Sequence, residues 1–238
     1  MSGPRGALHL IPVTLGAADA REALARSTLE AIAALDYFIV ENEKSARAFL
    51  KSAGHPRKLA ALTLVRMDKD AVPARVAELL RPLFAGRSAG VLSEAGCPAV
   101  ADPGALLVEA AHHAGLRVIP HVGPSSLLLA LMASGFNGQR FAFHGYLPVA
   151  KADCRRALVQ LERASRAADA TQIFIETPYR NDALLESVLA ACTPTTRLCV
   201  ATDLTLATES VRSAAVGEWK KEKTTLGRRP SVFLLYAR

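Results

Sequence analysis

Four loop segments of this sequence combine glycine and proline with hydroxyl or charged side chains. They are residues 11–16 (IPVTLG), 93–104 (SEAGCPAVADPG), 121–126 (HVGPSS) and 176–180 (ETPYR). Glycine lets the backbone approach a ligand closely, and proline rigidifies the path of a loop. Each segment follows a strand-like apolar run, and ligands collect beyond the carboxyl ends of strands in open α/β sheets. The four segments therefore predict the rim of a small-molecule site.

The segment 93–104 carries the most information. It includes two glycines, two prolines and two acids, and such a loop is costly to order unless it packs onto something. Gly96 permits a close approach to a ligand. Asp102 and Pro103 suit the N-cap and the first turn of a following helix, so we expect capping rather than catalysis from Asp102.

Residues 123–126 (GPSS) predict the start of another helix. The exposed N–H groups of a helix start, together with the hydroxyls of Ser125 and Ser126, suit a carboxylate or a hydroxylated ligand. The same spacing also provides a serine N-cap, and the two roles are compatible.

Several other chemistries lack their sequence patterns. There is no G-x-G-x-x-G after the first strand-like run, no G-x-x-x-x-G-K-[ST], no H-E-x-x-H and no G-x-S-x-G. The four cysteines include no C-x-x-C pair and have no histidine at metal-ligand spacing, so we expect no metal. Cys192 and Cys199 are typical of small buried hydrophobes, and Cys97 has no neighbour that would activate a thiolate.

Alternating strand-like and helix-like segments must position these loops. In the N-terminal part the alternation predicts a mainly parallel sheet with helices on both faces. The last strands follow one another with little helix between them, which predicts antiparallel pairing. We expect strands at 7–15, 37–40, 58–64, 88–92, 117–119, 141–144, 171–175, 198–202, 209–215 and 231–237, and helices at 24–34, 43–52, 74–83, 106–114, 126–133, 151–167 and 179–191.

Size and composition allow two α/β domains, which we expect at residues 1–120 and 121–238. The chain has 238 residues, of which half are apolar, so each half can bury a core. The net charge of +7 permits a polyanion such as RNA as partner, but the basic clusters are short and suit a solvated surface equally well. The most apolar stretch, 127–133, is too short to cross a membrane, and no signal-peptide region precedes the first strand-like run. We therefore expect a cytoplasmic protein without membrane contact.

In this order and spacing, the four loops resemble those of the tetrapyrrole methylase superfamily of S-adenosylmethionine-dependent methyltransferases. The likeness is strongest to the subfamily that methylates a cytidine ribose 2′-hydroxyl in 16S ribosomal RNA, whose second loop reads roughly S-D-A-G-T-P-G-I-S-D-P-G. Its motifs G-[FY]-L-P and E-[ST]-P-[HY]-R occur as residues 145–148 and 176–180, and its R-E-L-T appears as TDLT at 202–205. The likeness covers nearly the whole chain.

This resemblance implies a two-domain αβα fold that dimerises and holds S-adenosylmethionine in a cleft between the domains. Most contacts to the cofactor would come from the backbone. The positions that match the family's cofactor contacts are Leu15, Glu94, Ala95, Gly96, Ser125, Ser126, Glu176, Thr177 and Leu204.

Transfer of a methyl group to a hydroxyl also requires a base that accepts the proton. Glu41, at the end of the second predicted strand, is the first candidate and Glu176 the second, although a solvated or helix-capping role suits each carboxylate as well. Arg47 and Arg180 are candidates for holding a phosphate or carboxylate of the substrate, or for surface ion pairs.

The departures from the family pattern fall on the substrate side. The pattern P-T-P-I-G-N is represented by residues 12–17 (PVTLGA), and E-D-T-R-x-[ST] by residues 41–46 (ENEKSA). An H-N-E-type segment is replaced around residues 63–67, and we expect no counterpart of the C-terminal extension that many rRNA enzymes carry. The cofactor half of the site is therefore better preserved than the acceptor half.

Three functions follow as hypotheses. The first is an RNA ribose 2′-O-methyltransferase, with RNA and a second copy of the chain as partners. The second is a methyltransferase for a tetrapyrrole or another small molecule, which the altered acceptor side allows. The third is a protein that binds S-adenosylmethionine without turnover.

Overall fold

The computed structural model describes residues 4–16, 19–67 and 73–238. The chain divides into two compact units, Met1–Ser125 and Ser126–Arg238. The first unit contains a five-stranded parallel sheet and the second a five-stranded mixed sheet, each with helices on both faces. The fold class expected from the sequence is therefore confirmed. The boundary expected after residue 120 lies five residues before the division between the units.

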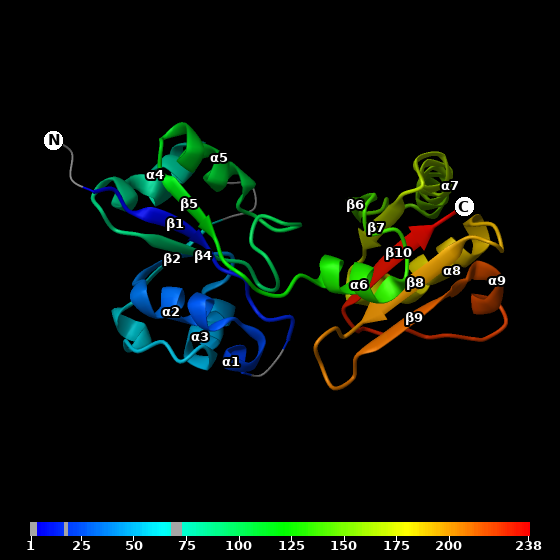
Figure 1. Ribbon diagram of the computed structural model, residues 1–238, viewed down its shortest axis with the longest axis horizontal. Helices are drawn as coiled ribbons and strands as arrows, with labels where there is room; N and C mark the ends of the chain where they lie inside the picture. Colours follow the sequence, from blue (N-terminus) through cyan, green and yellow to red (C-terminus); the bar gives the residue numbers. More distant parts are fainter. Residues whose placement is uncertain (1–3, 17–18, 68–72) are drawn as a thin grey trace. The chain divides into compact units, whose positions relative to one another are not determined.

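The sheet of the first unit has the strand order β3-β2-β4-β1-β5 (Figure 1). All of its strand pairs are parallel. Because parallel neighbours require crossover connections, the chain passes over the sheet between successive strands. The strands are β1 (Ala7–Leu10), β2 (Tyr37–Val40), β3 (Thr63–Arg66), β4 (Ala89–Leu92) and β5 (Arg117–Pro120).

Helices cover both faces of this sheet, as Figure 1 shows. One face packs against α1 (Ala20–Ala23), α2 (Arg26–Ala34) and α3 (Glu43–Ser52). The other packs against α4 (Pro73–Phe84) and α5 (Ala105–His113). All four residues of β2 are buried, which explains why its sequence YFIV lacks the alternation of a half-exposed strand.

The sheet of the second unit has the order β6-β7-β10-β8-β9. The pair β6–β7 is parallel, and the remaining pairs are antiparallel. The prediction of antiparallel pairing among the last strands is confirmed. The strands are β6 (Phe141–Tyr146), β7 (Thr171–Ile175), β8 (Arg197–Thr202), β9 (Ser210–Ala215) and β10 (Ser231–Tyr236).

Two layers of helix complete the second unit. One core cluster joins α7 (Lys151–Ala168), α8 (Asn181–Ala191) and α9 (Val216–Trp219) to one face of the sheet. The helix α6 (Ser126–Ser134) packs on β8, β9 and β10 and stays outside that cluster, so it covers the opposite face. Within the described residues, no helix combines the length and the apolar character needed to cross a membrane.

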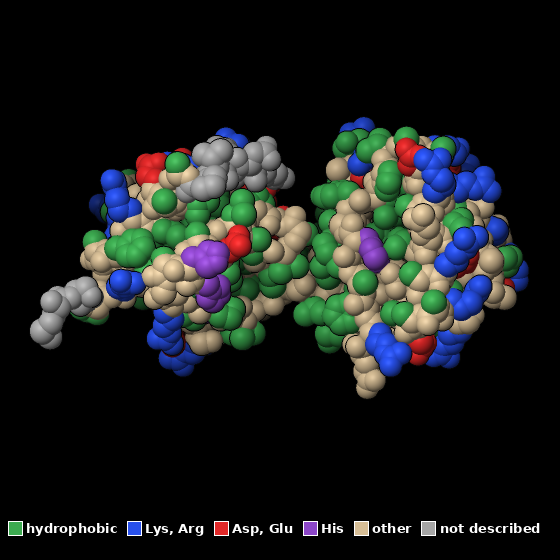
Figure 2. Space-filling model, turned by 90° about the horizontal axis from the view of Figure 1, so that it is seen from above, with side chains coloured by type: hydrophobic (Ala, Val, Ile, Leu, Met, Phe, Trp, Pro, Cys, Tyr) green, Lys and Arg blue, Asp and Glu red, His purple; other side chains and the backbone are tan. Residues whose placement is uncertain are grey.

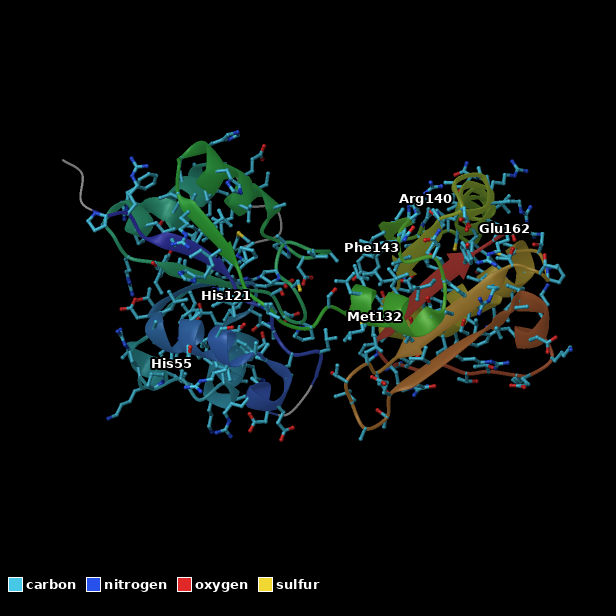
Figure 3. The ribbon with its side chains drawn as sticks, viewed as in Figure 1. His55, His121, Met132, Arg140, Phe143 and Glu162 are labelled. Carbon is cyan, nitrogen blue, oxygen red and sulfur yellow. The ribbon has the colours of Figure 1, made fainter. Side chains whose placement is uncertain are left out.

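A buried carboxylate ties α7 to the loop before β8. The side chain of Glu162, labelled in Figure 3, accepts hydrogen bonds from the Thr193 N–H at 2.8 Å and from the Thr196 hydroxyl at 2.5 Å. Burial opposes ionisation of Glu162, but these hydrogen bonds outweigh it and lower the pKa of the carboxyl below its usual value. Glu162 therefore serves the packing of the second unit.

Three local expectations are wrong. The first strand ends at Leu10 rather than residue 15, because the chain leaves the sheet at Ile11 to enter the buried layer of α1–α3. Residues 59–61 form a 3-10 turn, η1 (Leu59–Ala61), and the strand begins only at Thr63. The N-cap of α5 is Gly104, with φ at 139°, so Asp102 does not cap this helix.

Candidate functional site

The chain reverses its winding direction at the carboxyl ends of β1 and β4. These strands are neighbours in the sheet, yet β1 leads to α1 and α2 on one face whereas β4 leads to α5 on the other. Loops that diverge in this way open a crevice at the sheet edge, where open α/β sheets bind their ligands. Two of the four loops singled out from the sequence, 11–16 and 93–104, therefore border a switch point of the first unit.

Hydrogen bonds join these two loops directly. The Val13 N–H donates to the Gly96 carbonyl at 2.8 Å, and the Gly96 N–H donates to the Val13 carbonyl at 2.9 Å. Gly96 has φ at 71°, a conformation that glycine adopts without strain. A Cβ at Gly96 would lie 3.5 Å from the Leu15 side chain. Two residues predicted to touch the cofactor, Leu15 and Gly96, thus lie together.

The loop after β5 packs onto the loop after β1. A Cβ built on Gly123 would lie 2.4 Å from Cβ of Pro12 and 3.2 Å from a methyl carbon of Leu24. The buried Thr28 hydroxyl donates to the Val122 carbonyl at 2.7 Å, which fixes the same loop to α2. Gly123 is therefore required here for close packing. The predicted contact Ser125 ends the first unit, and Ser126 begins α6, as the GPSS pattern predicts.

Cys97 lies in the same group of loops. Its thiol donates to the Pro124 carbonyl at 3.5 Å, and burial raises the pKa of this thiol. The neutral thiol is therefore favoured, which fits a packing role and not that of a nucleophile. Cys192 and Cys199 are buried, as expected from the sequence. Among the residues that the structure describes, no cluster of metal-ligating side chains occurs.

Glu41 extends from the end of β2 to the loop after β4. Its carboxylate accepts the Glu94 N–H at 3.3 Å. Glu41 does not cap the next helix, because Asn42 is the N-cap of α3 and accepts the Lys44 N–H. The first base candidate therefore contacts the backbone of a residue predicted to touch the cofactor.

Arg47 interacts mainly with its own surroundings. Its guanidinium donates to the Leu59 carbonyl at 3.1 Å and lies 3.6 Å from the Glu43 carboxylate, one helical turn away. A pair of this kind on an exposed helix surface contributes little stability. The structure thus shows the ion pair that was one of the two interpretations of Arg47. The other interpretation, a substrate contact, stays a prediction.

The loop 93–104 holds two alanines in the left-handed region of backbone conformation. Ala99 has φ at 66° and Ala101 has φ at 64°. This conformation costs an L-residue about 1–2 kcal/mol, whereas glycine adopts it freely. The related loop pattern S-D-A-G-T-P-G has glycine at the position of Ala99. The left-handed conformation of Ala99 therefore strains this loop, whereas a glycine at the same position, as in the family motif, would not.

Replacing Ala99 by Gly is expected to stabilise the first unit by about 0.5–1 kcal/mol, since the relieved strain exceeds the added freedom of the unfolded chain. Urea denaturation would measure the change. Ala110→Gly, inside α5, is the control and is expected to destabilise by about 1 kcal/mol. A loss of stability in Ala99→Gly would contradict the strain argument.

Two histidines pair beside β5. His9, on β1, and His121, labelled in Figure 3, approach within 2.9 Å between Nδ1 of His9 and Nε2 of His121. One ring N–H must donate to the other ring, so the contact requires at least one neutral imidazole. Burial, followed by His121 and Arg117, lowers the pKa of His9, and burial lowers the pKa of His121.

The free energy of unfolding of the first unit is expected to fall as the pH drops below 6.5, the usual pKa of histidine. The unfolded chain takes up protons before the folded pair does, so protonation favours unfolding in that range, and the contribution is fully present above it. Urea denaturation at pH about 7.5 and about 5.5 would measure the loss. The loss should shrink in His121→Gln, and an equal loss in both proteins would contradict the prediction.

In the second unit, β6, β7 and β8 end at one edge of the sheet. The strands β7 and β8 are both antiparallel to β10, and β6 is parallel to β7, so the three run in the same direction. Segments 145–148 and 202–205 begin in the last residues of β6 and β8, and segment 176–180 directly follows β7. The motifs that the sequence separates by about thirty residues thus meet at one edge.

Glu176 organises this edge. Its Oε1 accepts the Thr177 N–H at 2.6 Å, the Thr177 hydroxyl at 3.1 Å, and the Arg180 guanidinium through Nη2 at 2.5 Å and Nε at 3.0 Å. The Glu176 side chain is 6% exposed. All of these hydrogen bonds end on the same oxygen, Oε1, which is thereby fully engaged within the loop. Glu176 therefore positions Arg180 and its own loop.

Leu204 lies on the loop beyond β8. It is buried, and its neighbours Asp203 and Thr205 have φ at 52° and 73°. The Glu209 carboxylate accepts the Thr205 N–H at 2.7 Å, and the Thr208 hydroxyl donates to Asp203 at 2.9 Å. This tight loop holds the Leu204 backbone at the same edge as Glu176.

Comparisons with known proteins agree with these loops. The chain is 32% identical over 223 residues to "Ribosomal RNA small subunit methyltransferase I" of Escherichia coli O157:H7, an alignment that spans 92% of this chain and 73% of the relative. It is 34% identical over 211 residues to the protein of the same name from Mesorhizobium japonicum, spanning 88% and 67%. No family model matches the chain.

Solved structures share the fold. Diphthine synthase matches with a TM-score of 0.69 at 17% identity, covering 97% of this chain and 90% of that one. The methyltransferase CobJ matches with a TM-score of 0.63 at 18% identity, covering 98% and 100%. At this level of identity the likeness concerns the fold alone.

Proposed function

Because the chain belongs to the ribosomal RNA small subunit methyltransferase I family, we propose that this methyltransferase transfers the methyl group of S-adenosylmethionine to a ribose 2′-hydroxyl of ribosomal RNA. The observation that carries the proposal is the alignment of about a third identity over most of the chain. The loops at the ends of β1, β4 and β7 agree with it. We further propose a cytoplasmic homodimer.

The cofactor would contact both groups of loops. In the first unit we assign Leu15, Glu94, Ala95 and Gly96, and the residues Ser125 and Ser126 follow at the start of α6. The Gly96 backbone groups already pair with Val13, so its contribution is close approach without a side chain. In the second unit we assign Glu176, Thr177 and Leu204. The Glu176 side chain would contribute indirectly, because its carboxylate fixes the conformation of the loop through the Thr177 N–H.

The bound cofactor would supply an activated methyl group, and the protein must align the acceptor and remove its proton. Alignment alone can lower a barrier by about 7–11 kcal/mol. Methyl transfer to a hydroxyl would form an O–CH₃ bond as the S–CH₃ bond breaks and would leave S-adenosylhomocysteine, so a group of the protein must accept the hydroxyl proton. We assign this proton to Glu41, whose carboxylate lies beside the Glu94 backbone. Arg47 and Arg180 are the candidates for holding the phosphates.

Titration calorimetry with S-adenosylhomocysteine tests whether the chain binds the cofactor, which both methyltransferase hypotheses require. Binding is expected, and no heat up to millimolar ligand would remove both methyltransferase hypotheses. Mass spectrometry of rRNA nucleosides, with and without the protein, tests the acceptor, and a 2′-O-methylated nucleoside that depends on the protein is expected.

A tetrapyrrole or another small molecule is the second candidate acceptor. The replaced acceptor-side segments around residues 41–46 and 63–67 favour it, since their side chains differ from the rRNA pattern. Cofactor binding with unchanged rRNA nucleosides would support this candidate. Cofactor binding without transfer to any component of a crude extract would instead support a protein that has lost turnover.

A further inference from the structure

The four tyrosines of the chain fall into two classes. Tyr37 and Tyr236 are buried, whereas Tyr146 is 57% and Tyr179 is 69% exposed. Both exposed tyrosines lie at the ends of neighbouring strands in the second unit. Tyr146 is the last residue of β6, and Tyr179 lies in the turn η2 (Pro178–Arg180) beyond β7. Large exposed aromatic side chains that gather at one edge indicate a binding surface.

The backbone directs Tyr146 to this edge. The register between β6 and β7 shifts between Phe143 and Tyr146, and Gly145 has φ at 64° in the irregular step. A bulge of this kind re-aims the side chain that follows it. Tyr146 then pairs with Ile175, the residue before Glu176.

An arginine held by a buried carboxylate lies beside the Tyr179 ring. The Arg180 Cζ lies 5.7 Å from the centre of the Tyr179 ring. Its hydrogen bonds to Glu176 raise the pKa of Arg180, so the guanidinium stays charged beside this ring. Only 25% of the Arg180 side chain is exposed, so the guanidinium plane is fixed in position.

A cavity of about 130 Å³ adjoins this arginine. Pro148, Val149 and Lys151 line it together with Glu176 and Arg180. The edge therefore combines two exposed tyrosine side chains, a guanidinium held by hydrogen bonds and a further cation, Lys151. On the face that Figure 2 shows, other basic side chains are spread around both units and interspersed with hydrophobic and acidic ones. Dispersed charge favours contact with a backbone of phosphates but selects no particular place.

Unpaired RNA bases are recognised by this chemistry. They stack on tyrosine rings and on guanidinium planes, and each stacked base contributes about 1–3 kcal/mol. We propose that Tyr146, Tyr179 and Arg180 form a stacking surface for single-stranded nucleotides of the RNA acceptor. This inference rests on the proposed rRNA methyltransferase function and deepens it, because it places the acceptor strand at the ends of β6 and β7.

Fluorescence anisotropy with a labelled single-stranded RNA of about twelve nucleotides tests the proposal. Measured with S-adenosylhomocysteine present, Tyr146→Ala and Tyr179→Ala are each expected to weaken RNA binding about 5- to 150-fold. Tyr→Phe at either position keeps the ring and should bind within about twofold of the unaltered protein. The slope of log Kd against log salt should stay the same in the Tyr→Ala variants, because stacking releases no counterions.

Phe141→Ala is the matched control. Phe141 is 45% exposed and begins the strand that Tyr146 ends, so its loss should leave RNA binding unchanged. Calorimetry with S-adenosylhomocysteine checks that each variant is folded and binds the cofactor. If the unaltered protein binds RNA and both Tyr→Ala variants bind equally well, the stacking surface is wrong and the rRNA function stands. If the unaltered protein binds cofactor but no RNA, the RNA acceptor itself fails.

Discussion

Glu41→Gln is expected to lower kcat about 100- to 10,000-fold, the range that a general base contributes. A glutamine has the same shape as the glutamate and keeps an oxygen that accepts a hydrogen bond, but it does not take up a proton from an alcohol. The Glu94 N–H at 3.3 Å would therefore keep its partner, and the loop 93–104 would keep its position. Single-turnover methyl transfer to rRNA would measure the rate.

Glu41→Ala separates the two roles of this side chain. Alanine removes both the proton acceptor and the partner of the Glu94 N–H, so it should lower the rate as glutamine does and also weaken binding of S-adenosylhomocysteine. If Glu41 only positions the loop, Glu41→Gln will turn over at the normal rate, and Glu41→Ala alone will lose affinity. That outcome would remove Glu41 as the base.

The elements of the fold could be predicted because local pattern and burial agree. The run YFIV at residues 37–40 is a strand buried on both faces, and the expected helix at 43–52 is α3 with the same bounds. The hydrophobic spacing of a long helix is equally clear at residues 151–167. Periodicity alone suffices for such segments, because tertiary packing reinforces the local preference.

The failures occur where the backbone leaves regular structure. The run 7–15 stays apolar beyond the point where the chain leaves the sheet, because Ile11 and Val13 are buried in the helical layer. Within this run only Pro12 signals that the strand ends. Asp102-Pro103 has the composition of a helix start, yet the left-handed Ala101 and the positive φ of Gly104 delay α5 to Ala105. Such turns depend on contacts that sequence spacing does not contain.

Of the candidate site, too, only part could be predicted from the sequence. The order of the motifs predicted Leu15, Gly96 and Glu176 as site residues, and in the structure the Leu15 side chain lies beside Gly96. The exposure of Tyr146 and Tyr179 could not be predicted from the sequence, because exposure is a property of the folded chain. A signal existed in the scarcity of aromatic residues, 5% of the chain, which makes tyrosines inside two loop motifs conspicuous. The saturation of Glu176 by Arg180 likewise required the coordinates.

Gly123→Ala is expected to destabilise the first unit by up to about 3 kcal/mol and to weaken S-adenosylhomocysteine binding at least about tenfold. The added Cβ would lie 2.4 Å from Cβ and 2.8 Å from Cγ of Pro12. The Pro12 ring is joined to its own backbone and can change only its pucker, which hardly moves Cβ, so the backbone of the loop 121–126 or of 11–16 must shift. Urea denaturation and calorimetry would measure the two effects.

Gly138→Ala supplies the control for this substitution. A Cβ at Gly138 meets nothing within 4 Å, so the same chemical change occurs in open space in the second unit. Both substitutions restrict the unfolded chain equally, by about 0.4–1 kcal/mol, so any difference between them reports the contact with Pro12. If Gly123→Ala binds the cofactor normally, the packing of these two loops does not shape the cofactor site. Cofactor binding at the switch point would then depend on the contact between Val13 and Gly96, which the substitution leaves in place.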